Sequence, residues 1–126
     1  MNVGTELPTL KLKPISRTTL ALFAGASGDH NPMHIDIDVA KSAGLEDVFA
    51  HGMLSMAYLG RLLTDNFDSA SIRSYRVRFA SITPVHGKPT ATGKVVSIED
   101  GLATLELTVA LEDGTVTLSG DAVVAI

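Results

Sequence analysis

A carboxylate and an imidazole that could share acid and base roles lie five residues apart in the segment 27–34. Asp29 and His34 are separated by Pro32, which does not fit a helix interior and favours an extended conformation of the residue before it. On a continuous helix this spacing would place the two side chains roughly 140° apart, whereas an irregular loop lets them converge. Because loops on a rigid scaffold often carry catalytic groups, the segment predicts a site of acid–base chemistry.

A second segment offers a hydrogen-bond donor for the same chemistry. Gly52 lies at the predicted start of an apolar helix. The first N–H groups of a helix have no acceptor within the helix and lie at the positive end of its dipole. The backbone amide of Gly52 is therefore predicted to stabilise negative charge that develops on a carbonyl oxygen.

Three helices are predicted to position these groups. The first covers 18–26, with Ser16 as its cap and its end at Gly25 or Gly28. The second covers 38–43, with Asp36 or Asp38 as its cap and its end at Gly44. The third and longest covers 51–64. Apolar residues are distributed around most of the circumference of the longest helix. A helix of this kind is expected to be buried on nearly every side.

Strands are predicted from the alternation of apolar and polar residues in the second half of the chain. The runs are 72–82, 89–98, 102–111 and 115–126, and turn signals lie at 99–101 and 112–115. The stretch 7–15, which contains Pro8 and Pro14, predicts an edge strand or an extended lead-in. An antiparallel sheet curved around one buried helix satisfies both patterns. The predicted fold class is therefore α+β, as a single domain over residues 1–126.

The motif residues resemble the signature of the MaoC-like (R)-specific enoyl-CoA hydratases, which have the hot-dog fold. The match covers 23–29 and 31–34 and resumes at 50–54. The resemblance implies that Asp29 and His34 are the catalytic pair and that the Gly52 amide binds the thioester oxygen. It also implies the reaction: interconversion of a trans-2-enoyl thioester, on coenzyme A or an acyl carrier, with an (R)-3-hydroxyacyl thioester. No cofactor is expected, because the carrier is part of the substrate.

Two alternatives of other kinds stay open. Hot-dog thioesterases and acyl-carrier dehydratases commonly have an acidic residue on the central helix, and 51–64 contains no Asp or Glu. A non-catalytic subunit of a heteromeric dehydratase would tolerate loss of the acid–base pair, which this chain retains. Both observations favour an active hydratase.

A metal site is the alternative chemistry for the histidines. His30 and His34 have the i, i+4 spacing of two zinc ligands on a helix, and Asp29 or Asp36 would complete the set. Because Pro32 opposes a continuous helix there, no metal is predicted.

Five further residues are predicted to contact substrate or to support the loop. Asn31 is a turn-forming residue that could also orient the catalytic carboxylate. His51 and Met53 flank Gly52, and for His51 a structural role at the helix entry is favoured over substrate contact. Strand alternation places Arg76 and Arg78 on one face, as a potential anchor for the phosphates of the carrier.

Composition limits the remaining possibilities. The chain has no cysteine, which excludes disulfides and thiolate catalysis, and its net charge of −4 argues against general nucleic-acid binding. No apolar run approaches the roughly 20 residues of a membrane span, and residues 1–7 do not resemble a secretory signal, so a cytoplasmic protein is expected. Hydrophobic residues make up 45% of the chain, which favours burial in an oligomer: a homodimer, or a heteromer with a second hot-dog subunit.

Overall fold

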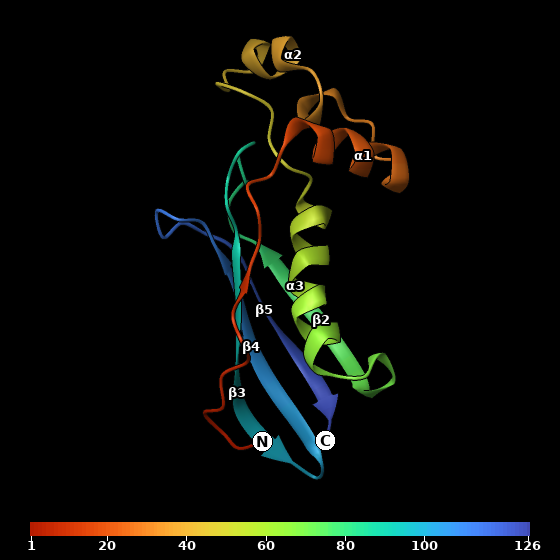
Figure 1. Cartoon of the computed structure of the whole chain (residues 1–126), viewed down its shortest axis with the longest axis vertical. Helices are drawn as coiled ribbons and strands as arrows, with labels where there is room; N and C mark the ends of the chain where they lie inside the picture. The colour runs from red at the N-terminus through yellow and green to blue at the C-terminus, as the bar shows by residue number, and fades with distance from the viewer.

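One antiparallel sheet packs against a long helix in the computed structural model, which describes residues 1–126 (Figure 1). The sheet has the order β1-β3-β4-β5-β2. Its strands are β1 (Leu10–Lys11), β2 (Ile72–Phe79), β3 (Thr90–Glu99), β4 (Leu102–Ala110) and β5 (Val116–Ala125). The helices are α1 (Arg17–Ser27), α2 (Ile37–Ser42) and α3 (Gly52–Asn66), with 3-10 turns η1 (Pro32–His34) and η2 (Ser69–Ser71). No helix is both long and apolar enough to cross a membrane.

The hairpins form at the turns that the sequence predicted. Asp100 and Gly101 have φ angles of 52° and 75° between β3 and β4, which is the conformation that a two-residue hairpin turn requires. Gly114 has a φ of 88° between β4 and β5. These turns pair β3 with β4 and β4 with β5 along nearly their whole lengths.

The main core lies between the sheet and α3. Along β4, every second side chain is fully buried and faces the helix: Ala103, Leu105, Leu107 and Val109. Leu59, Leu62 and Leu63 are the α3 residues buried against them. Burial of each such leucine contributes about 1.5–3 kcal/mol, so this interface holds α3 firmly against the sheet.

The prediction that α3 is buried on nearly every side is wrong for the single chain. Met53 is 58% exposed, and Ala57 and Arg61 are also exposed. The five-stranded sheet covers only one side of the helix, and the other side is open in Figure 1. The apolar character of this open side is therefore not accounted for by the fold of one chain.

Gly120 is required by the close approach of β5 to β2, and its replacement should be costly. A Cβ at this position would clash with the carbonyl oxygen of Arg76 and lie 3.0 Å from the Cα of Val77. We expect Gly120→Ala to lower the free energy of unfolding by about 1–3 kcal/mol, because the backbone of β2 must move. Urea denaturation measures this change. Gly25→Ala, in α1, is the control, since a Cβ there has no neighbour within 4 Å; equal stability of the two variants would contradict the prediction.

A second, smaller core fixes the motif segment above the N-terminal end of α3, as Figure 1 shows. It consists of Ile15, Leu20, Ala40, Val48, Ala50, Leu54 and Val85. Ser16 accepts a hydrogen bond from the N–H of Thr19 and caps α1, and Gly28, with a φ of 76°, ends it. Arg17 also pairs with Asp47 through both carboxylate oxygens. The loop that follows α1 therefore starts from a well-defined position.

Candidate active site

Asp29 follows directly after the left-handed Gly28, in a loop shaped by its own side chains. Its Oδ1 accepts a hydrogen bond from the N–H of Asn31 at 3.2 Å, and Oδ1 of Asn31 accepts one from the N–H of Met33 at 3.1 Å. Such Asx turns are the reason why Asp and Asn are favoured in loops. Asn31 is exposed and braces the loop as the sequence predicted, and the Asp29 carboxyl group remains half exposed.

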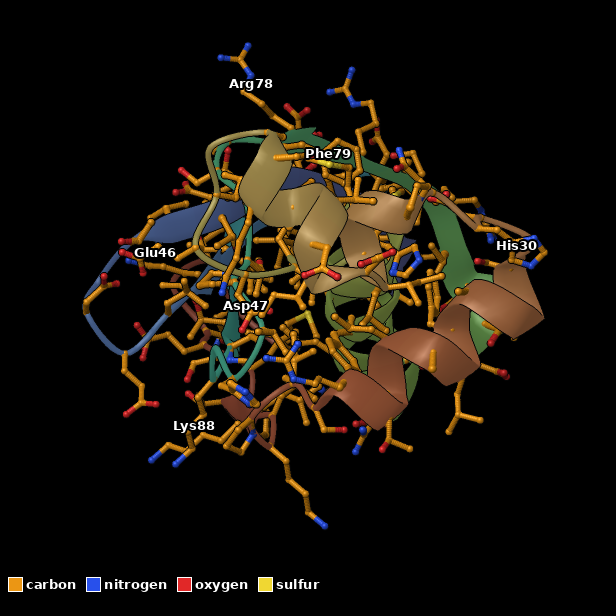
Figure 2. All side chains as sticks on the ribbon, turned by 90° about the horizontal axis from the view of Figure 1, so that it is seen from above. His30, Glu46, Asp47, Arg78, Phe79 and Lys88 are labelled. Atoms are coloured by element: carbon orange, nitrogen blue, oxygen red, sulfur yellow. The ribbon has the colours of Figure 1, made fainter.

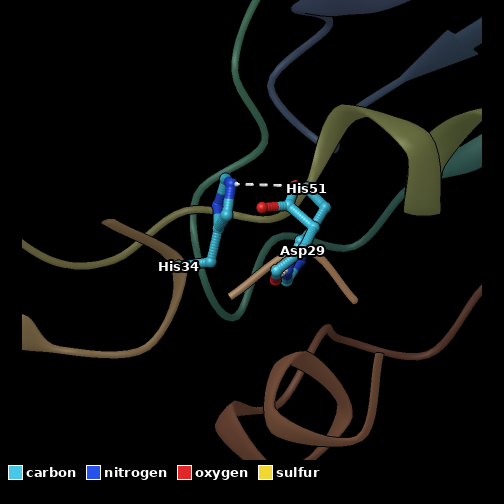
Figure 3. A group of neighbouring side chains, drawn as sticks. All are labelled: Asp29, His34 and His51. Atoms are coloured by element: carbon cyan, nitrogen blue, oxygen red, sulfur yellow. Dashed lines mark hydrogen bonds and ion pairs between the residues drawn. The ribbon is translucent and has the colours of Figure 1, made fainter. Parts of the chain in front are cut away.

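His34 lies at the end of η1, and its ring is buried next to Asp29. Nδ1 is 2.7 Å from the carbonyl oxygen of Phe49. Because a carbonyl only accepts, Nδ1 carries the proton in the neutral ring and Nε2 has a free lone pair. Nε2 lies 3.9 Å from Oδ2 of Asp29 (Figure 3). That distance is too long for a direct hydrogen bond, but one substrate or water oxygen can contact both groups.

His51 connects the loop to α3. Its ring stacks on that of His34, with centroids 4.0 Å apart, and meets the ring of Phe23 edge-on at 4.9 Å. Nε2 lies 3.2 Å from the backbone carbonyl oxygen of Asp29. Burial lowers the pKa of His51, the Asp29 carbonyl opposes this effect, and His34 adds to it. His51 is therefore held in its neutral form among protein groups.

Gly52 is the first residue of α3 and has no positive φ. It borders a cavity of about 280 Å³. A Cβ on Gly52 would lie 3.0 Å from the ring of Phe79, which is half exposed at the end of β2. Ser55 and Thr83 add buried hydroxyl groups to the wall of this cavity. The unpaired amide at the N-terminus of α3 is thus next to a space that a ligand can enter.

Arg76 and Arg78 lie on the face of the sheet that points away from α3. Tyr75, the neighbour of Arg76, donates a hydrogen bond to the Met56 carbonyl on α3, so the alternating residues Arg76 and Arg78 face outward. Arg76 binds both carboxylate oxygens of Asp121, and Arg78 extends into solvent (Figure 2). Within one chain, the structure does not bring either arginine to Asp29 and His34. Met53, which the sequence also placed at the site, points to the surface.

The cluster of potential metal-ligating groups differs from the set considered in the sequence. Asp29, His34 and His51 place one donor atom each within 4.8 Å of one another. His30 is exposed and lies outside this cluster (Figure 2). The proximity of His51 had no signal in the spacing, because it arises from contacts across 17 and 22 residues of the chain.

The buried neutral state of His51 predicts a pH dependence of stability. Because its folded-state pKa lies below the ordinary value of 6.5, the unfolded chain binds a proton more readily than the folded chain. The free energy of unfolding should fall as the pH drops through this range. His51→Phe has no group that titrates at this position. As the pH is lowered from neutral to about 5, the Tm of the wild type should therefore fall more than the Tm of the variant. A Tm difference that does not change with pH would contradict this prediction.

The antiparallel sheet packed on the long helix α3, with Asp29 and His34 close together near the N-terminus of that helix, is the arrangement of a hot-dog fold. The chain belongs to the family described as the MaoC like domain, whose model matches residues 1–115. The predicted fold class and family are confirmed.

Several named proteins are similar to this chain in sequence or in structure. The chain is 32% identical over 102 residues to 3-hydroxyacyl-thioester dehydratase Z of Mycobacterium tuberculosis, covering 75% of this chain and 68% of that protein. The (R)-hydratase from A. caviae involved in PHA biosynthesis superposes with a TM-score of 0.89 at 26% identity, over 100% of this chain and 97% of that one. The ChsH1-ChsH2 complex from Mycobacterium tuberculosis gives a TM-score of 0.88 at 25% identity, over 100% and 98%.

Proposed function

We propose that this protein is a hydro-lyase that interconverts trans-2-enoyl thioesters and (R)-3-hydroxyacyl thioesters. The observation that carries the proposal is the pair formed by Oδ2 of Asp29 and Nε2 of His34, 3.9 Å apart beside the N-terminus of α3. Membership of the MaoC-like family and the hydratase and dehydratase relatives support it. Coenzyme A or phosphopantetheine enters as part of the substrate, and no separate cofactor is needed.

In the hydration direction, one water is held between the two side chains. The Asp29 carboxylate accepts a hydrogen bond from the water, and Nε2 of His34 takes a proton from it as the oxygen bonds to C3 of the enoyl group. The electron pair of the C2–C3 double bond moves toward the thioester carbonyl. His34 then returns the proton to C2, so that the elements of water are added and the enzyme is unchanged. The Phe49 carbonyl keeps the proton on Nδ1 and holds the ring in this orientation.

The Gly52 amide is assigned to the thioester oxygen. Negative charge develops on that oxygen while C3 is attacked, and an N–H group at a helix N-terminus stabilises it most in the transition state. The cavity beside Gly52, lined by Phe49, Phe79, Ile82 and Leu118 among others, is the space assigned to the acyl group.

The direct test is hydration of a panel of trans-2-enoyl-CoA thioesters of increasing acyl length by the purified protein. Loss of enoyl absorbance should accompany formation of the (R)-3-hydroxyacyl product, which chiral chromatography identifies. Absence of turnover with every chain length, or formation of the (S) product, would contradict the proposal. The same assay with acyl-carrier thioesters distinguishes the two carriers.

Association of two chains, in a homodimer or a heteromer, is the second part of the proposal. β2 is an eight-residue edge strand with no partner on one side, and such edges favour pairing with another chain. Met53, Phe79 and Ile82 are exposed apolar residues close to it or to α3. The observation that supports a heteromer is the similarity to the ChsH1-ChsH2 complex. Sedimentation and a hydration assay of the protein expressed alone distinguish a homodimer from a heteromer. An active monomer would contradict both arrangements.

A further inference from the structure

We propose that His51 is a positioning residue that holds Asp29, His34 and the Gly52 amide in a single arrangement. This inference rests on the proposed function, because the three groups are the ones assigned to catalysis there. His51 itself is only 1% exposed, so its effect is exerted through its neighbours.

The first connection is the hydrogen bond to Asp29. The carbonyl of Asp29 can only accept, so Nε2 of His51 donates across the 3.2 Å between them. The other bonds of Asp29 are short-range ones, to Ser27 and Asn31 within its own loop. The bond from His51 is therefore what attaches the backbone of the catalytic carboxylate to the start of α3.

The second connection is the stack on His34. The two rings are inclined by 26° with centroids 4.0 Å apart, and Phe23 meets His51 edge-on. The His34 ring is also held by the Phe49 carbonyl at Nδ1 and meets the Phe49 ring edge-on at 4.9 Å. The His51 ring covers a face of the His34 ring, and this contact supports the orientation in which Nε2 of His34 points toward Asp29.

The third connection is covalent. His51 is the N-cap residue of α3, with φ −58° and ψ 133°, and makes no side-chain capping bond. Its side chain is bound to the motif loop instead, while its own peptide group carries the Gly52 amide. A shift of the loop relative to α3 is therefore opposed at the residue that precedes the proposed oxyanion donor.

One ring nitrogen of His51 makes no hydrogen bond, and this argues that His51 does more than fill space in the core. Nδ1 of His51 is buried without a hydrogen-bond partner, which destabilises the fold. Phenylalanine would fill the same space next to Phe23 and His34 without this cost. The one feature of histidine that the site uses and phenylalanine lacks is the Nε2 donor toward Asp29.

Two variants separate the donor from the ring. His51→Phe keeps the aromatic stack and loses the donor, whereas the side-chain amide of His51→Gln can place an N–H near the position of Nε2. We expect kcat to fall about 10- to 100-fold in His51→Phe with little change in KM, since small misplacement of catalytic groups has effects of this size. His51→Gln should recover part of this loss. Thermal melts establish that both variants are folded.

Crystal structures of the two variants give a readout that does not depend on activity. In His51→Phe the Asp29 carboxylate should move away from Nε2 of His34, and in His51→Gln it should stay. An inactive wild type would contradict the proposed function, and the structures would still decide the role of His51. Unchanged kcat in His51→Phe, an unmoved Asp29, or a glutamine variant no better than phenylalanine would overturn the inference.

Discussion

Asp29→Asn is expected to lower kcat for enoyl-thioester hydration by about 10²- to 10⁴-fold while the protein stays folded. The side-chain oxygen of asparagine can still accept the hydrogen bond from the N–H of Asn31, so the turn that shapes the loop is kept. What is lost is the carboxylate 3.9 Å from Nε2 of His34. Steady-state kinetics with a trans-2-enoyl-CoA substrate measure the effect.

His34→Asn should have an effect of similar size for a complementary reason. The side-chain amide nitrogen of asparagine can replace Nδ1 as the donor to the Phe49 carbonyl, whereas nothing replaces Nε2. Because Asp29 and His34 act on one water, the double variant should be hardly less active than either single variant. His30→Gln is the control, since this neighbouring histidine is exposed and lies outside the cluster.

Two outcomes would contradict the assignment of the pair. Near-normal activity in either single variant would remove that residue from the mechanism. A double variant whose loss equals the product of the two single losses would show that Asp29 and His34 act independently rather than on a shared proton.

Gly52→Pro is expected to reduce kcat by about 10²- to 10³-fold, equivalent to about 3–4 kcal/mol of transition-state stabilisation. Proline removes the amide proton proposed to bind the thioester oxygen. The backbone accepts it, because Gly52 occupies the first helical position, where proline is favoured. His51 before it already has the extended φ and ψ, −58° and 133°, that a residue preceding proline adopts.

Gly52→Ala is the matched control for this experiment. Both substitutions add a Cβ that would lie 3.0 Å from the Phe79 ring, so both require the same small movement of that side chain. Alanine alone keeps the N–H. If the two variants are equally stable in thermal melts and turn over at similar rates, the thioester oxygen is held by another group and Gly52 has no catalytic role.

Much of the fold was predictable because its signals act over a few residues. Ser16 caps α1 through the N–H of Thr19, and Asp100 with Gly101 forms the β3–β4 turn, each through local backbone geometry. The alternation along β4 assigns its buried face correctly for the same reason. The approach of Asp29 to His34 also belongs here, since only the short loop around Pro32 separates them.

Other features depend on contacts between distant parts of the chain, which no local pattern encodes. The apolar circumference of α3 predicted burial all around, but one sheet covers only one side, so Met53 is exposed. The alternation placed Arg76 on the correct face of its strand. Its pairing with Asp121 and its distance from Asp29 and His34 follow instead from the position of β2 in the sheet. His51 was predicted either to contact substrate beside Gly52 or, preferably, to have a structural role at the start of the helix. The ring of His51 lies against His34, and its Nε2 against Asp29, only because α1 and the loop after it pack on the start of α3. That packing is decided by the burial of side chains that are far apart in the sequence.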